Sequence, residues 1–138
     1  MTATTDQPAA VTRTGHAVPG KVCALAETHL GRAPAGTWLA TATRVDVGNW
    51  LRRARVYLCL DGDTLLLVAA GHDGYCQEAS LSCLDESIYN PATGALVLAP
   101  AKDLAVRSLE MAPLDARALL ERIGSARTAR AEDTARKV

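Results

Sequence analysis

Two apolar segments on either side of an Asp-Gly-Asp turn constrain the fold of this chain more than any other feature. Residues 54–60 (ARVYLCL) and 64–70 (TLLLVAA) consist mostly of aliphatic and β-branched side chains, which favour strands. Asp61-Gly62-Asp63 stands between them, and glycine accepts the positive φ that tight hairpin turns require. The sequence therefore predicts an antiparallel hairpin near the middle of the chain.

Further strands are predicted on both sides of this hairpin. Residues 37–47 combine alternating large and small side chains with β-branched residues, and Gly48 is expected to end that strand. Residues 75–84 alternate apolar and polar side chains, as a half-buried strand does. Three more strands follow, at residues 87–89, 95–99 and 104–111. Seven strands in series with tight turns predict a mainly β fold, an antiparallel barrel or sandwich.

A C-terminal helix is predicted after the strands. Pro113 suits the first position of a helix, and Leu119 and Ile123 recur at the spacing of one helical face. Gly124 is expected to end the helix as its C-terminal cap. An isolated helix of this length is marginally stable, so we expect it to pack against the sheet. The predicted domain, α+β by content, then spans residues 37–124.

The segments outside this domain are predicted to be less ordered. Residues 1–17 are rich in Thr and Ala and show no hydrophobic period, which predicts a disordered arm. Residues 18–36 show helical spacing as far as Gly31, where a short helix is expected to stop before a linker. Residues 125–138 are polar and are expected to form a flexible tail.

Charge excludes some classes of partner. Fifteen basic and fifteen acidic residues leave a formal net charge of +0, so no overall field attracts nucleic acid or an anionic membrane. Residues 38–124 carry eleven acidic and eight basic residues, a mildly acidic balance. We therefore expect no nucleic-acid partner.

The cysteines and the N-terminus indicate a reducing compartment. Cys23, Cys59, Cys76 and Cys83 include no CxxC pair and no zinc-site spacing, so free thiols and no metal are expected. The first residues contain no secretory signal, and no apolar run is long enough for a transmembrane segment. The prediction is a cytoplasmic protein without a cofactor.

One segment resembles a known superfold. Residues 49–58 (NWLRRARVYL), followed by DGDTL at 61–65, are similar to the part of pleckstrin-homology (PH)-like domains where Trp and basic residues precede the second strand. Seven strands and then a C-terminal helix, from about Trp38 to Ile123, also resemble that superfold. The chain looks like a distant, bacterial-type member, and the resemblance implies a seven-stranded antiparallel barrel or sandwich capped by a helix.

The resemblance also implies a binding site. In phosphoinositide-binding members, one basic residue late in the first strand and two in the second hold the lipid phosphates, and Arg44, Arg53 and Arg55 stand at similar positions. Arginine suits this role because its planar fork binds phosphate oxygens in pairs. The cluster of Arg52, Arg53 and Arg55 could instead protect a strand edge or bind an acidic peptide or partner surface. Trp50, in the same loop, could cover the barrel end or anchor a partner.

Three functions stay open at this point. The first is a non-enzymatic binding or scaffold domain that engages a protein or peptide partner, or a second copy of itself, at a sheet edge or beside the C-terminal helix. The second is recognition of an anionic lipid or small metabolite through Arg44, Arg53 and Arg55. The third is a small enzyme using His72 near Cys76. No nucleotide-binding, hydrolase or metal-site motif is present in the sequence, so no catalytic residue is assigned.

Overall fold

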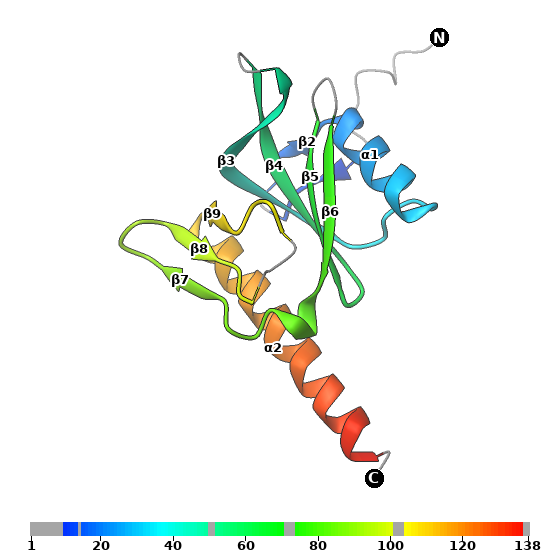
Figure 1. Ribbon diagram of the computed structural model, residues 1–138, viewed down its shortest axis with the longest axis vertical. Helices are drawn as coiled ribbons and strands as arrows, with labels where there is room; N and C mark the ends of the chain where they lie inside the picture. Colours follow the sequence, from blue (N-terminus) through cyan, green and yellow to red (C-terminus); the bar gives the residue numbers. More distant parts are fainter. Residues whose placement is uncertain (1–9, 14, 50–51, 71–73, 101–103, 137–138) are drawn as a thin grey trace.

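The computed structural model describes residues 10–13, 15–49, 52–70, 74–100 and 104–136, and for 45–49, 52–53 and 133–136 it describes the backbone alone (Figure 1). Within these residues the fold is mostly β-sheet. The strands are β1 (Ala10–Val11), β2 (Ala17–Val18), β3 (Thr37–Asn49), β4 (Arg52–Asp61), β5 (Thr64–Ala69), β6 (Tyr75–Ser80), β7 (Ile88–Asn90), β8 (Ala95–Val97) and β9 (Ser108–Glu110). The helices are α1 (Gly20–Leu30), the short 3₁₀ helix η2 (Leu81–Cys83) and α2 (Pro113–Arg136).

The nine described strands form three antiparallel sheets. The largest has the order β3-β4-β5-β6, the second the order β7-β8-β9, and the third is the small pair β1-β2. The predicted central hairpin is confirmed, with Asp61 paired to Thr64 across the turn and Gly62 at φ 60°. From β3 onward, one four-stranded and one three-stranded sheet precede α2, an arrangement consistent with an unclosed sandwich.

A buried core packs against each face of the four-stranded sheet. Alternate residues such as Leu58 and Leu67 pack into the core shared with the three-stranded sheet and α2. Their neighbours, such as Cys59 and Val68, pack into a second core beneath α1 and β2. Five consecutive residues of β5 are consequently buried. This explains why β5 is a continuous apolar run, because only strands with one solvated face alternate.

The segment after α1 is tied to the central hairpin. Gly31 ends α1 at φ 76°, as predicted, and its N–H donates to the Glu27 carbonyl. Arg32 then donates from two guanidinium nitrogens to the carboxylate of buried Asp61, at 2.9 and 3.2 Å. Gly36 lies so close to β4 that a Cβ atom there would be 1.6 Å from the Leu60 carbonyl oxygen. The predicted linker is therefore held to β4 at Arg32 and at Gly36.

The C-terminal helix is much longer than predicted. It continues through Gly124 to Arg136, and its later turns run past the sheets (Figure 1). Ala116, Leu119 and Ile123 are buried against the body. The prediction that Gly124 ends the helix was wrong because the residues after it are mostly Ala, Arg, Glu and Thr, several of them strong helix formers.

Several strand boundaries also differ from the prediction. β3 continues through Gly48 to Asn49, since pairing with β4 compensates for the weak strand preference of these residues. The predicted strand 75–84 ends at Ser80, where η2 places Leu81 in the core and Cys83 at the surface. The predicted strand 104–111 is shortened to β9.

The N-terminal segment differs in part from the predicted disordered arm. β1 and β2 pair antiparallel, with Ala10 opposite Val18, and the Arg13 N–H donates to the Trp38 carbonyl at 2.9 Å. Residues 1–9 lie outside the described part. The division into arm, linker, domain and tail stays a prediction.

Among the described residues, none of the helices is both long enough and apolar enough to cross a membrane.

Candidate binding site

An irregularity in β3 positions the basic residues of the central hairpin. Ala40 pairs with Tyr57 and Arg44 with Arg55, so three residues of β3 lie opposite one residue of β4. Thr41, inside this bulge, donates from its buried hydroxyl to the Val56 carbonyl at 2.8 Å. Bulges of this kind bend a strand and redirect the side chains that follow.

The same bulge joins the two larger sheets. The Thr43 hydroxyl oxygen accepts a hydrogen bond from the backbone N–H of Glu110 in β9, at 2.7 Å. The backbone N–H of Thr43 in turn donates to Thr41 Oγ1 at 3.2 Å. Arg44 follows directly, so its backbone is held by contacts on both β4 and β9.

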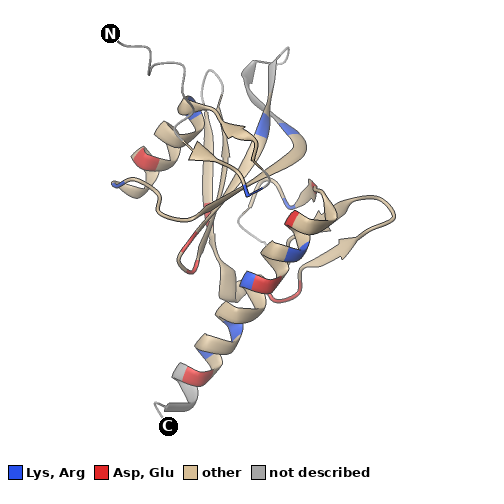
Figure 2. Ribbon diagram, turned by 180° about the vertical axis from the view of Figure 1, so that it is seen from behind, with Lys and Arg blue, Asp and Glu red and all other residues tan. Residues whose placement is uncertain are grey.

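Arg44 and Arg55 are direct cross-strand partners. Both side chains are exposed, and Figure 2 shows two basic positions next to each other on β3 and β4, below the tip of their hairpin. No ion pair or hydrogen bond of either side chain is seen within the described part of the chain. Like charges placed directly opposite each other destabilise a sheet, so this pair has a cost for folding.

The arginine pair lies on a definite face of the sheet. Residues two apart in a strand share a face, so Arg55 is on the same side as Tyr57 and Cys59, which pack beneath α1 and the N-terminal hairpin. Neither α1 nor that hairpin covers the pair, because Arg44 and Arg55 are exposed. Two guanidinium groups are thus presented together to solvent, an arrangement that binds carboxylate or phosphate oxygens.

The other predicted site residues are only partly described. Arg53 and Arg52 belong to β4, where they pair with Asp46 and Asn49, and their side chains are not described. Trp50 lies outside the described residues. Of the five predicted binding residues, the structure therefore brings together Arg44 and Arg55.

The proposed thiol chemistry finds no support in the geometry around Cys76. His72 lies outside the described residues. Cys76 is half-buried in β6, and desolvation, followed by the Glu78 charge, raises the pKa of its thiol to about 11. A nucleophilic cysteine needs a lowered pKa. In the described ranges no group of three or more His, Cys, Asp or Glu side chains could hold a metal ion.

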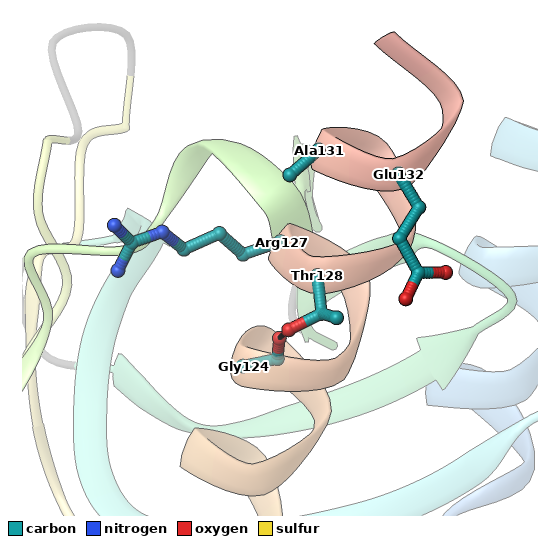
Figure 3. Close-up of a pocket in the computed structure, with 5 residues that line it drawn as sticks. All are labelled: Gly124, Arg127, Thr128, Ala131 and Glu132. Atoms are coloured by element: carbon teal, nitrogen blue, oxygen red, sulfur yellow. Dashed lines mark hydrogen bonds between the residues drawn. The ribbon is translucent and has the colours of Figure 1, made fainter. Parts of the chain in front are cut away.

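Two features of the surface near α2 were not predicted from the sequence. The Arg130 guanidinium donates to the exposed Cys83 thiol at 3.2 Å, and this contact lowers the pKa of that thiol. The outward side of α2 around Gly124 forms a shallow hollow (Figure 3). A prediction that the Ala- and Arg-rich tail continues the helix would have indicated both features, since the Cys83 contact and the hollow each depend on residues beyond Gly124.

Comparison with known proteins yields no relative. No family model, no curated protein and no solved structure matches this chain. The site must therefore be interpreted from its own chemistry.

Proposed function

We propose that this protein is a non-enzymatic binding domain that engages an acidic segment of a protein partner through Arg44 and Arg55. The observation that carries the proposal is their position directly opposite each other in the β3–β4 ladder, both exposed. Nothing in folding requires such a pair, because its repulsion opposes strand pairing. A bound anionic group would convert this repulsion into two charge-assisted contacts.

The surroundings favour a localised anionic segment over a broad anionic surface. Residues 38–124 are mildly acidic in total, so most of the domain surface repels a negatively charged membrane. A peptide carboxylate needs contact only with the arginine pair. For this reason we propose a protein partner, with an anionic lipid as the alternative that the experiment must separate.

Two further proposals accompany this one. The succession of a four-stranded sheet, a three-stranded sheet and a C-terminal helix supports membership of the PH-like superfold. Arg53, two residues before Arg55 in β4, is proposed to extend the same basic face. The fold proposal does not establish the ligand, because one fold hosts many functions.

The test uses the full chain and a fluorescein-labelled peptide of ten glutamates. Fluorescence anisotropy at low salt should show binding that Arg44→Ala and Arg55→Ala each weaken by about tenfold, the range expected for losing a charge-assisted contact. Arg107→Ala is the matched control, since Arg107 is an exposed arginine preceding β9 on the other sheet. It should bind as the wild type does.

Vesicles test the alternative. Flotation with phosphatidylserine vesicles, compared with phosphatidylcholine alone, should show no retention that depends on Arg44 or Arg55. Binding of the anionic vesicles but not of the peptide would move the assignment to a lipid ligand. Equal peptide binding by wild type, Arg55→Ala and Arg107→Ala would remove the arginine pair as a site.

A further inference from the structure

The outward side of α2 is a second exposed surface, separate from the arginine pair. Ala116, Leu119, Ile123 and Ala126 face the body and are buried. On the opposite side of the helix, exposed residues recur at three- and four-residue spacing along most of its length. They are Arg117, Glu121, Gly124, Ser125, Thr128, Ala131 and Glu132.

The middle of this side is hollow. Gly124 has no side chain, and a Cβ atom there would meet nothing within 4 Å. Arg127, Thr128, Ala131 and Glu132 border the space, and the Thr128 hydroxyl donates to the Gly124 carbonyl at 3.0 Å (Figure 3). A second helix could therefore approach α2 most closely at Gly124, as small residues permit.

The later turns of α2 contact the body only through polar side chains of the described residues. From Arg127 to Glu132 every described side chain is exposed, and the helix has left the apolar core. Arg127 reaches Asp85 at 3.7 Å and Arg130 reaches the Cys83 thiol, both on the side that faces the body. A helix that is polar all round needs such pairs or a partner to be stable. Apart from the Arg117–Glu121 pair, the outward side has no ion pair within the described part of the chain.

The pattern on the outward side is complementary to itself when two copies of α2 lie antiparallel. If the two-fold axis passes between Gly124 and Ser125, each residue faces the residue of the second copy that lies equally many positions beyond the axis. Gly124 then meets Ser125 of the second copy, and the two smallest side chains stand at the crossing.

The same register brings opposite charges together. Arg117 faces Glu132 of the second copy, and Glu121 faces Thr128, whose hydroxyl can donate to a carboxylate. Each contact occurs twice by symmetry. Arg117 and Glu132 lie about 22 Å apart along the helix at 1.5 Å per residue, so the ion pairs form at the two ends of the crossing.

We propose that this protein forms a symmetric dimer with a second copy of itself through antiparallel packing of α2. The contact involves one helix from each copy, which places it below about 1,200 Å² of buried surface, in the range of weak and transient interfaces. The dimer is therefore concentration-dependent. Its specificity comes from the two Arg117–Glu132 pairs, and its close approach comes from Gly124.

Sedimentation velocity of the full chain over a range of concentrations tests the proposal. The wild type should shift reversibly from monomer to dimer. Arg117→Glu and Glu132→Arg should each weaken the dimer by about tenfold, because each places like charges at both ends of the crossing. The double variant Arg117→Glu/Glu132→Arg exchanges the charges and should restore the wild-type dissociation constant.

Two further variants separate dimer loss from loss of the fold. Gly124→Gln fills the hollow with a good helix former, so the protein should stay folded by circular dichroism and become monomeric. Lys21→Glu, an exposed charge reversal on α1, should leave the dimer unchanged. A wild type that is monomeric at all concentrations overturns the proposal. A dimer that is insensitive to Glu132→Arg, or a double variant as weak as the single ones, overturns it equally.

Discussion

Reversing the charge of Arg55 should stabilise the fold while destroying the proposed site. Arg44 and Arg55 are direct cross-strand partners, so their Cβ atoms lie roughly 5 Å apart. At distances of this order in water two unit charges interact with about 1 kcal/mol, and the exposed guanidinium groups can splay to reduce this to about 0.5 kcal/mol. Arg55→Glu changes repulsion into attraction of similar size. The expected gain in the free energy of unfolding is about 1 kcal/mol.

The measurement is urea unfolding of a double-mutant cycle. Arg55→Glu and Arg44→Glu should each be more stable than the wild type, and the double variant should lose this gain because it restores a like-charge pair. The effect of the intrinsic strand preference of glutamate cancels in the coupling energy, because each substitution contributes it equally in the single and the double variants. In 1 M NaCl the Debye length falls to about 3 Å and most of the coupling should disappear. A coupling energy of zero at low salt would refute the placement of these side chains against each other.

Three further predictions follow from the packing. Gly36→Ala should lower the free energy of unfolding by more than about 3 kcal/mol, because the new Cβ would lie 1.6 Å from a β4 carbonyl oxygen and must separate β3 from β4. A free energy of unfolding in urea within about 0.5 kcal/mol of the wild-type value would contradict this. Gly124→Ala should stabilise the protein by about 0.5–1 kcal/mol as a mid-helix substitution, whereas a helix ending at Gly124 would make it destabilising. Asp115 is buried with one carboxylate oxygen lacking a hydrogen-bond partner, and desolvation raises its pKa despite the nearby charges of Arg13 and His16. The stability that this raised pKa contributes is present below the ordinary Asp pKa of 3.8 and is lost as pH rises through the raised value. Asp115→Asn should therefore gain stability relative to the wild type as pH rises through this interval. Parallel pH profiles of the free energy of unfolding for the two proteins would contradict this.

The sequence predicts the strands that have strong local signals. The β4–β5 hairpin follows from two apolar runs and Gly62, and α1 ends at Gly31 as its glycine indicates. In both cases the determining interaction lies within a few residues of the chain, so a local pattern is sufficient.

Features that depend on distant contacts were not predictable in this way. The continuation of β3 through Gly48 depends on its pairing with β4, where Asn49 lies opposite Arg52. Leu81 belongs to the apolar alternation of β6, but a 3₁₀ turn, held by its N–H bond to the Asp63 carbonyl, places it in the core. In both cases tertiary packing overrides the local secondary-structure preference of the residues.

The candidate site was predicted by residue but not by geometry. Sequence alone places Arg44 and Arg55 in adjacent strands, yet their exact opposition depends on a bulge whose extra residues Thr41 and Thr43 bond to β4 and β9. A regular ladder continued from Ala40 and Tyr57 would have placed Arg44 opposite position 53, two residues further along β4, on the same face as Arg55 but not directly opposite it. The bulge therefore both turns the corner between the sheets and aligns the two charges. The bend contributes to folding, whereas the alignment of two like charges opposes it.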